Sequence, residues 1–452
     1  MRSLAGWLDD RTGIGRLCAA FRDKPIGRKP AWSRTFGPIV LVLLGFVCLS
    51  GVVLSLSYSP SADHAHGSVQ YIINEVDLGG FIRSLHFHGT NFLVIALVIY
   101  GFQLIRRAAY RTPFELQWWI GLGAFALIIA IATVGYLLPW DQHGYWGTRV
   151  RTSIISSIPL IGNLKKEFLL GGPEIGNLSL TRFYTAHVVV LPFLLVGFLG
   201  AYMMLSSRNA YLTEKGEDSI PWWPSQASRD LLAGTGVVVL LFLVARWLPH
   251  PLGDKADPLE TYPARPEWYF LWLFQSLKYF KGPTEVIGTV AVPGACALFL
   301  FLLPYIDRKG EKSLSCRKPV LAFLFISSFS WIALTGIALS EDYRSGHFKE
   351  MKIWSAQPDP DFDVDAFYER DCFECHGKDG SGYLDSTPDF SSVEYWSTVR
   401  SDYRLIKTIL DGVANEMIPE DEQMPAYRDE ITADQAKAVV VRKIRPFAPS
   451  ED

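Results

Sequence analysis

Seven long apolar stretches dominate this 452-residue chain before residue 341. A helix needs about 20 apolar residues to cross the roughly 30 Å hydrocarbon core of a bilayer. Backbone polar groups in lipid must be satisfied within the segment, so the stretches predict an all-α, polytopic bundle of seven transmembrane helices. They lie near residues 36–58, 83–105, 116–138, 183–206, 230–248, 287–306 and 319–340.

The distribution of basic residues predicts the orientation of this bundle. Residues 1–35 carry eight Lys or Arg and no small-residue cleavage site, so the first stretch is expected to be a retained span. Arg106, Arg107, Arg111 and the loop 307–318, with five Lys or Arg, fall on the same side as residues 1–35. The positive-inside rule makes that side cytoplasmic. The loops 59–82, 139–182 and 249–286 and all residues after the last span are then expected outside.

A Cys-x-x-Cys-His sequence stands in the last hundred residues, formed by Cys372, Cys375 and His376. Such a sequence is typical of covalent haem attachment, with the histidine as one axial ligand. Zinc would need two further ligands nearby, and a thioredoxin-like redox pair would need a βαβ setting. We therefore predict a haem c. The remaining cysteines are scattered and imply no disulfide framework, and the net charge of −3 gives no support for nucleic-acid binding.

The tail that follows this sequence resembles the small class I cytochromes c. Met424-Pro425-Ala426-Tyr427 precedes a helix-like stretch from residue 431 to 447. The resemblance implies that Met424 is the second axial ligand of haem c, with Met417 as the alternative. A small α-helical cytochrome c domain is thus expected at the C-terminus.

Two histidines in the apolar stretches predict a second redox centre. A single buried histidine is more often a structural core residue, but His86 and His187 lie at similar depth near the outer ends of two different spans. Gly51 and Gly135 lie near the outer ends of two other spans, where a missing side chain lets a flat cofactor approach the backbone. This pattern predicts a haem b with two histidine ligands. His88 points to a different side of its helix and is the weaker candidate.

The chain resembles cytochrome b of the quinol-oxidising bc complexes, in the plastid-type arrangement of a four-span cytochrome b followed by a three-span subunit IV. The resemblance covers about residues 5–341 and implies that Arg83 also binds haem b. The matching segments are Arg83-Ser84-Leu85-His86, residues 135–146, residues 158–162, residues 180–187 and Pro266-Glu267-Trp268-Tyr269.

The Pro-Glu-Trp-Tyr segment is the most specific of these marks. Oxidation of a quinol requires removal of two protons, and a carboxylate at the membrane edge provides an exit for them. The resemblance implies that Glu267 accepts a proton at the outer quinol site, with Tyr269 nearby and Trp140, Asp141 and Tyr145 shaping the pocket. In the alternative interpretation, Glu267 is a solvated acid that pairs with Arg265. The family also implies a histidine supplied by a separate Rieske iron–sulfur protein.

The chain departs from the family at the inner haem b, whose ligands are expected about four helical turns further in. That register falls on Tyr100, fourteen residues after His86, and on Tyr202, fifteen residues after His187. A buried phenol is costly to ionise, so we expect no inner haem. Gly37 and the glycine at 121, each fourteen residues before an outer glycine, leave unusual ligation of a retained haem as the alternative.

The inner quinone residues of the family carry over weakly, to Arg208 and Arg229-Asp230. Charged residues at a cytoplasmic helix end are more often plain topology determinants.

These observations predict a cytochrome b/c subunit of a bacterial quinol:cytochrome c-type oxidoreductase, with one haem b, one haem c and quinol as substrate. The expected partners are the Rieske protein, other c-type cytochromes, the membrane quinone pool and a second copy of the chain in a homodimer. One alternative is a membrane electron-transfer subunit of another respiratory complex, and another is a structural subunit with a degenerate redox chain. The expected parts are a cytoplasmic segment 1–35, a four-span domain 36–220, a three-span domain 221–341, a linker 342–366 and a cytochrome c domain 367–452.

Overall fold

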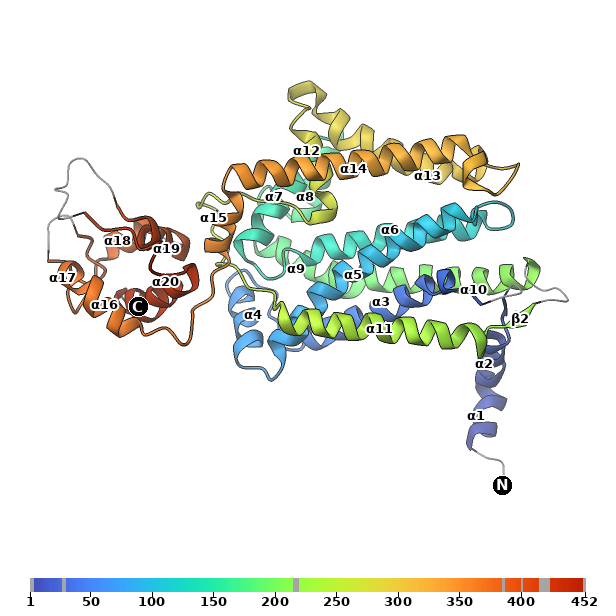
Figure 1. The fold of residues 1–452 in the computed structure, drawn as a ribbon, viewed down its shortest axis with the longest axis horizontal. Coiled ribbons are helices and arrows are strands. Elements are labelled where there is room, and N and C mark those ends of the chain that lie inside the picture. The colour runs from blue at the N-terminus through green and yellow to red at the C-terminus, as the bar shows by residue number, and fades with distance from the viewer. Residues whose placement is uncertain are drawn as a thin grey trace. The chain divides into compact units, whose positions relative to one another are not determined.

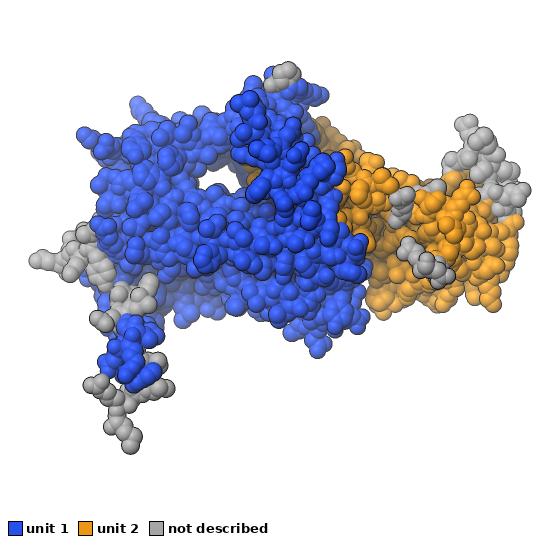
Figure 2. All heavy atoms as spheres, turned by 180° about the vertical axis from the view of Figure 1, so that it is seen from behind, with its two compact units in different colours: residues 1–138, 153–250, 276–332 blue, residues 139–152, 251–275, 333–452 orange. Residues whose placement is uncertain are grey.

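The computed structural model describes residues 4–26, 30–213, 219–383, 387–399, 401–413 and 423–449. Its chain forms two compact units, shown in blue and orange in Figure 2. Unit 1 comprises residues 1–138, 153–250 and 276–332, and unit 2 comprises residues 139–152, 251–275 and 333–452. The membrane helices belong mainly to unit 1, whereas unit 2 gathers two inter-span loops and the C-terminal part.

Seven helical spans are long and apolar enough to cross a membrane in the described part of the chain, as predicted. Several begin earlier than the apolar pattern indicates, because polar residues continue the helix beyond the apolar stretch. The spans are α3 (Phe36–Ser55), α5 (Gly79–Arg106), α6 (Glu115–Gly135), the run Asn177–Asn209 formed by α9 (Asn177–Thr185), η2 (Ala186–Val190) and most of α10, then α11 (Ser225–Trp247), the run Ile287–Ile306 formed by η5 (Ile287–Ala291) and α13 (Val292–Ile306), and α14 (Lys318–Arg344).

The core of unit 1 is a seam of apolar side chains between α3, α5, α6, α10 (Leu191–Thr213) and α11, which lie side by side in Figure 1. Leu43, Leu93 and Leu241 are almost fully buried there. Many other apolar side chains on these helices are exposed, as expected of helices whose outer faces meet lipid.

Shorter elements of unit 1 surround the spans. They are α1 (Leu4–Thr12), α2 (Ile14–Arg22), an antiparallel pair of two-residue strands β1 (Pro25–Ile26) and β2 (Ile220–Pro221), η1 (Trp32–Arg34), α4 (Ala65–Asn74), α8 (Gly162–Leu170), η4 (Gly282–Thr284) and η6 (Leu314–Cys316).

Unit 2 contains a small helical domain with its own hydrophobic core. Phe367, Ile406, Ile409 and Val439 belong to this core, together with Ile353 from α15. The helices of unit 2 are α15 (His347–Trp354), α16 (Val364–Asp371), α17 (Phe373–His376), α18 (Val393–Thr398), α19 (Asp402–Asp411), α20 (Ala433–Val439), η8 (Val440–Ile444) and η9 (Arg445–Phe447). In the loops, α7 (Gln142–Ser156) begins in unit 2, where η3 (Trp268–Phe270) and most of α12 (Leu271–Leu277) also lie.

Candidate functional site

His86 and His187 face each other inside unit 1, with ring centroids 6.1 Å apart. The Nδ1 atom of His86 lies 3.0 Å from the carbonyl oxygen of Val47, and that of His187 lies 2.8 Å from the carbonyl oxygen of Ile131. A hydrogen bond at Nδ1 fixes the tautomer and leaves Nε2 as the metal-binding atom. The separation leaves room for one metal atom, since each metal–imidazole bond is about 2 Å long.

Two glycines make close approaches to this histidine pair. A Cβ atom at Gly51 would lie 3.0 Å from Cε1 of His86, and a Cβ atom at Gly135 would lie 2.4 Å from Cε1 of His187. The second distance is shorter than real Cβ contacts allow. The glycines therefore let the rings take these positions, and the four residues fit a haem b with two histidine ligands.

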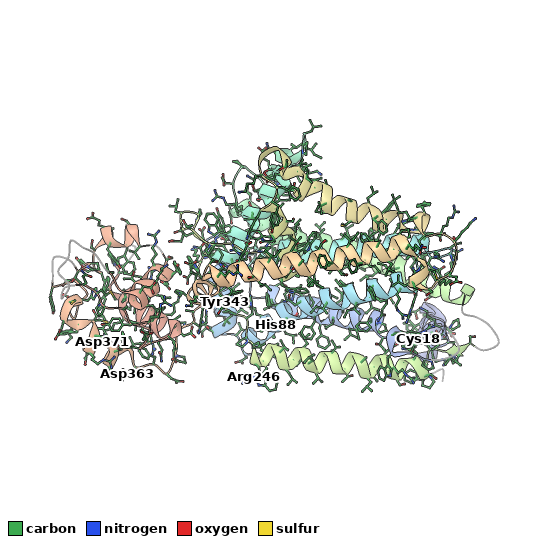
Figure 3. All side chains as sticks on the ribbon, turned by 45° about the horizontal axis from the view of Figure 1, so that its top comes forward. Cys18, His88, Arg246, Tyr343, Asp363 and Asp371 are labelled. Carbon is green, nitrogen blue, oxygen red and sulfur yellow. The ribbon has the colours of Figure 1, made fainter. Side chains whose placement is uncertain are left out.

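Two further polar side chains lie near the start of α5. Nε2 of His88 lies 2.7 Å from the carbonyl oxygen of Leu248, so this ring is turned away from the histidine pair, and Figure 3 labels it. Arg83, one turn before His86, is buried and donates a hydrogen bond to the carbonyl oxygen of His250.

Tyr100 and Tyr202 repeat the arrangement deeper in the bundle, with a different outcome. A Cβ atom at Gly37 would lie 3.5 Å from the ring of Tyr100, and one at Gly121 would lie 3.2 Å from the ring of Tyr202. The two hydroxyl groups are directly hydrogen-bonded at 2.7 Å. The two tyrosines thus contact each other directly, whereas the two histidines leave a gap that is wide enough for a metal.

The helix that carries His187 has an irregularity that explains its longer spacing. Residues Ala186–Val190 form the π-helical turn η2, whose i→i+5 hydrogen bonds hold one extra residue. Tyr202 therefore follows His187 by fifteen residues instead of fourteen and still meets Tyr100.

Asp230, near the start of α11, is already occupied by structural hydrogen bonds. Its carboxylate accepts from Nε1 of Trp222 and from Nε2 of Gln226, both at 2.8 Å, and Oε1 of Gln226 accepts from the backbone of Ala31. This carboxylate holds neighbouring segments together. Arg208 is exposed on α10.

The Cys-x-x-Cys-His residues form one turn in the small domain of unit 2, with Cys372 directly before α17. Both thiols are free. Nδ1 of His376 is buried without a hydrogen-bond partner in the described part of the chain, and burial lowers the pKa of this imidazole to about 4. A neutral imidazole with an uncommitted nitrogen is the form that binds a metal. These residues fit covalent attachment of a haem.

Met424 lies in an extended segment tied to the same domain. Its carbonyl oxygen accepts from the backbone of Val413, and the hydroxyl of Tyr427 donates to the carbonyl oxygen of Asp371, the residue before Cys372. Figure 3 labels Asp371 and Asp363, the residue at the other end of α16. Met424 and Cys372 pack against one hydrophobic cluster, which fits a shared ligand. Met417 lies outside the described residues.

Glu267 stands directly before η3 in unit 2, and burial raises the pKa of its carboxyl group to about 7, opposed by the positive charge of Arg151. Burial lowers the pKa of Arg151, and the charges of Glu267 and Tyr269 partly offset this decrease. None of the described residues donates a hydrogen bond to the carboxylate of Glu267. A carboxyl group with this pKa exchanges a proton readily near neutral pH.

Arg265 binds another carboxylate, which argues against a simple ion pair between Arg265 and Glu267. Arg265 donates two hydrogen bonds to Oδ1 of Asp342, at 2.9 and 2.7 Å. Burial and the charge of Glu267 raise the pKa of Tyr269 above its usual value.

Asp141 and Tyr145 lie at the start of α7. Oδ1 of Asp141 accepts from the backbone of Gly144 at 2.7 Å, as helix-capping carboxylates do. Trp140, directly before it, has a φ of 52°, a left-handed conformation rare for an aromatic residue. Tyr145 is buried against Trp140, with ring centroids 6.0 Å apart. Asp141 therefore positions this segment and the helix that carries Arg151.

Two residues of α7 were missed in the sequence analysis. Arg151 is one, and the other is His143, whose Nδ1 lies 3.0 Å from the hydroxyl of Tyr262. Burial, with the charges of Arg151 and His347, lowers the pKa of His143 to about 4. The sequence offered one indication of these residues, namely their position two to three turns apart on the short helix α7.

Comparisons with known proteins agree with this geometry. The family described as cytochrome b/b6/petB matches residues 23–208, and the family described as cytochrome b (C-terminal)/b6/petD matches residues 255–346. The family described as cytochrome C oxidase, cbb3-type, subunit III matches residues 363–441.

Curated relatives match over most of the chain. A cytochrome b of Rickettsia conorii is 31% identical over 333 residues, which cover 71% of this chain and 82% of the relative. A cytochrome b of Cereibacter sphaeroides is 28% identical over 370 residues, covering 74% and 82%. A cytochrome b/c1 of Bradyrhizobium diazoefficiens is 30% identical over 336 residues, covering 71% of this chain and 48% of the relative.

The fold is similar to that of a solved structure titled hyperthermophilic respiratory Complex III. The TM-score is 0.64 at 26% sequence identity, and the match covers 74% of this chain and 91% of the other.

Proposed function

We propose that this chain, which belongs to the cytochrome b family, oxidises quinol at an outer-side site where Glu267 accepts a proton. The chain is a redox subunit of a quinol oxidoreductase and carries a cytochrome c-type domain at its C-terminus. The observation that carries the proposal is the buried carboxyl group of Glu267, with a pKa of about 7 beside Arg151.

The chemistry of the site follows from this carboxyl group. A quinol hydroxyl loses its proton as its electron leaves, so a base must be within reach and unprotonated for part of the time. Glu267 meets the second condition at neutral pH because burial outweighs the charge of Arg151 and raises the pKa of its carboxyl group to about 7. Trp140, Asp141 and Tyr145 would shape the pocket, with Tyr269 nearby, and Asp141 would position this segment through its cap on α7.

His86 and His187 would hold haem b, with Gly51, Gly135 and Arg83 around it. Cys372, Cys375, His376 and Met424 would hold haem c. When bound, each haem supplies a one-electron acceptor.

We include in the proposal that the inner haem b is lost. The hydrogen bond of 2.7 Å between Tyr100 and Tyr202 supports it, because a porphyrin cannot lie between two side chains in direct contact. The chain would then carry one haem b and one haem c.

The remaining parts of the proposal concern partners and location. The chain works within a larger respiratory complex. A Rieske iron–sulfur protein would supply a histidine as the second hydrogen-bond partner of the quinol. Other c-type cytochromes, the quinone pool and a second copy of the chain would be the remaining partners. The basic residues of segment 1–35 and loop 307–318 support a cytoplasmic N-terminus in a bacterial membrane, with the haem c domain outside.

The test is the variant Glu267→Gln in the purified complex, measured for quinol oxidation and for both haem spectra. The amide has nearly the same size but accepts no proton, so turnover should fall by about 10²–10⁴-fold while the spectra stay unchanged. The matched control is Glu285→Gln, which changes an exposed glutamate and should leave turnover intact. Unimpaired turnover of Glu267→Gln would show that the loop acid is structural.

A further inference from the structure

Lys437 of α20 is buried between two carboxylates. Its ammonium lies 2.7 Å from Oδ1 of Asp254 and 2.6 Å from Oδ2 of Asp402, and the residue is 8% exposed. Lysine is almost never buried unless it is paired. Asp402 begins α19 in the same small domain, whereas Asp254 belongs to the inter-span loop that leads to Glu267. One ammonium group therefore joins the haem c domain to that loop.

Other contacts between the domain and the loop surround this ion cluster. Nε of Arg404 lies 3.1 Å from Oε1 of Glu260, a buried carboxylate of the loop. The side-chain amide of Gln357 donates to the carbonyl oxygen of Leu252 at 3.0 Å. Polar contacts thus extend from residue 252 to residue 260.

Aromatic rings connect the same two parts of the chain. Trp354 of α15 stacks in parallel on Tyr403 of the domain, with centroids 4.0 Å apart. Trp354 also makes an edge contact with the ring of Tyr262 from the loop, with centroids 5.1 Å apart. Trp354 is 4% exposed, so these rings bury apolar area between the loop and the domain.

Asp254 also links this contact to the segment proposed to shape the quinol pocket. Its carbonyl oxygen accepts from the backbone of Gln142 at 2.9 Å, while the backbone of Ala256 donates to the carbonyl oxygen of Trp140 at 3.0 Å. The backbone of the loop is therefore hydrogen-bonded to the start of α7, and the side-chain carboxylate of Asp254 binds Lys437 of the domain.

We propose that residues 252–262 form a docking platform for the haem c domain of this chain, and that Asp254 and Lys437 are its positioning residues. The haem c domain then keeps a fixed position on the loop, and its redox partners must diffuse to it. The consequence for electron delivery rests on the proposed function, whereas the docking does not.

The buried ion pair makes the docked position strongly preferred over a loose tether. Burial lowers the pKa of Lys437, but the charges of Asp254 and Asp402 outweigh it and raise the pKa. The lysine thus keeps its charge, and release of the domain would part that charge from Asp254. Without Asp254, Lys437 would keep its pair with Asp402 inside the domain but lose the one carboxylate that attracts it to the loop, so the docking equilibrium should shift by about tenfold or more toward release.

Pulsed EPR on the complete complex tests the docking directly. Spin labels are attached through Leu259→Cys in the platform and Val393→Cys in the domain, two sites that are 70% and 71% exposed. The cysteines outside the haem motif are replaced by serine, namely Cys18, Cys48, Cys296 and Cys316. A docked domain should give one narrow distance distribution. A broad distribution in this parent protein would overturn the proposal.

The variant Asp254→Asn should broaden that distribution. It keeps the shape of the side chain and leaves the Lys437–Asp402 pair inside the domain, so the haem c spectrum should remain unchanged and show that the domain is folded. The matched control is Asp365→Asn, which removes an aspartate–lysine pair of the same 2.7 Å length within the domain, to Lys443. A narrow distribution in Asp254→Asn would also refute the proposal, and Lys437→Met provides a second test of the same contact.

Quinol-driven reduction of haem c, followed by stopped flow, supplies the functional measurement. Asp254→Asn should slow it severalfold at an unchanged haem c potential, and Asp365→Asn should not. If the parent complex oxidised no quinol, the proposed function would fail while the EPR result still decided the docking.

Discussion

Arg151 is expected to set the pH at which Glu267 works. The pKa of Glu267 is about 7, the balance between burial, which raises it, and the positive charge of Arg151, which lowers it. An opposite charge close to a carboxyl group lowers its pKa by about 1–3 units. Replacing Arg151 by Gln removes that charge and should therefore raise the pKa of Glu267 by about one unit or more.

The size of the effect on turnover follows from the ionised fraction of Glu267. The proton acceptor must be ionised, so activity should rise with pH through about 7 in the parent protein. With a pKa near 8, the ionised fraction at pH 7 falls from about one half to about one tenth. Quinol oxidation by Arg151→Gln should thus be about fivefold slower at pH 7 and nearly normal at about pH 9.

The assay is the pH profile of quinol oxidation by the variant, divided by that of the parent complex. The division cancels titrations that both proteins share, including those of partner subunits. Arg151→Lys retains the positive charge and should keep the parent profile. A ratio that is constant across pH would refute the reasoning, since it would mean that Arg151 supports the fold or binds quinol without tuning Glu267.

Three further predictions concern the haems. Met424→Ala should convert haem c to a five-coordinate or misligated form with a shifted potential, read from its visible spectrum and a redox titration, and the same effect from Met417→Ala instead would overturn the ligand assignment. Gly135→Val should displace the neighbouring histidine and abolish the haem b spectrum while haem c stays; an unchanged haem b would show that the close approach is not required. The double variant Tyr100→His with Tyr202→His should bind a second haem b, detected as a doubled b content, because the glycines beside both rings are retained; either single variant should not.

The membrane architecture was predictable from the sequence because a bilayer imposes its thickness on every span. The limits of the spans were less predictable. α5 begins at Gly79 and α9 at Asn177, before the apolar stretches do, because helices continue into polar residues at the membrane surface. Met424 could be chosen as the second axial ligand of haem c only from the resemblance to the class I cytochromes c.

The proximity of His86 and His187 could also be foreseen, since their depth along two helices and the two glycines indicate it. The surroundings of Glu267 could not. Arg151 lies on a short helix whose packing depends on the segment capped by Asp141. Lys437 meets Asp254 across 183 positions of the chain, and no local pattern indicates such a pairing.

The haem content of the purified complex tests the central claim most directly. One haem b pair and a tyrosine pair in contact predict one haem b for each haem c, measured by the pyridine haemochrome assay on the wild-type chain. Two haems b for each haem c would contradict the loss of the inner haem and would require Tyr100 and Tyr202 to part and admit a porphyrin.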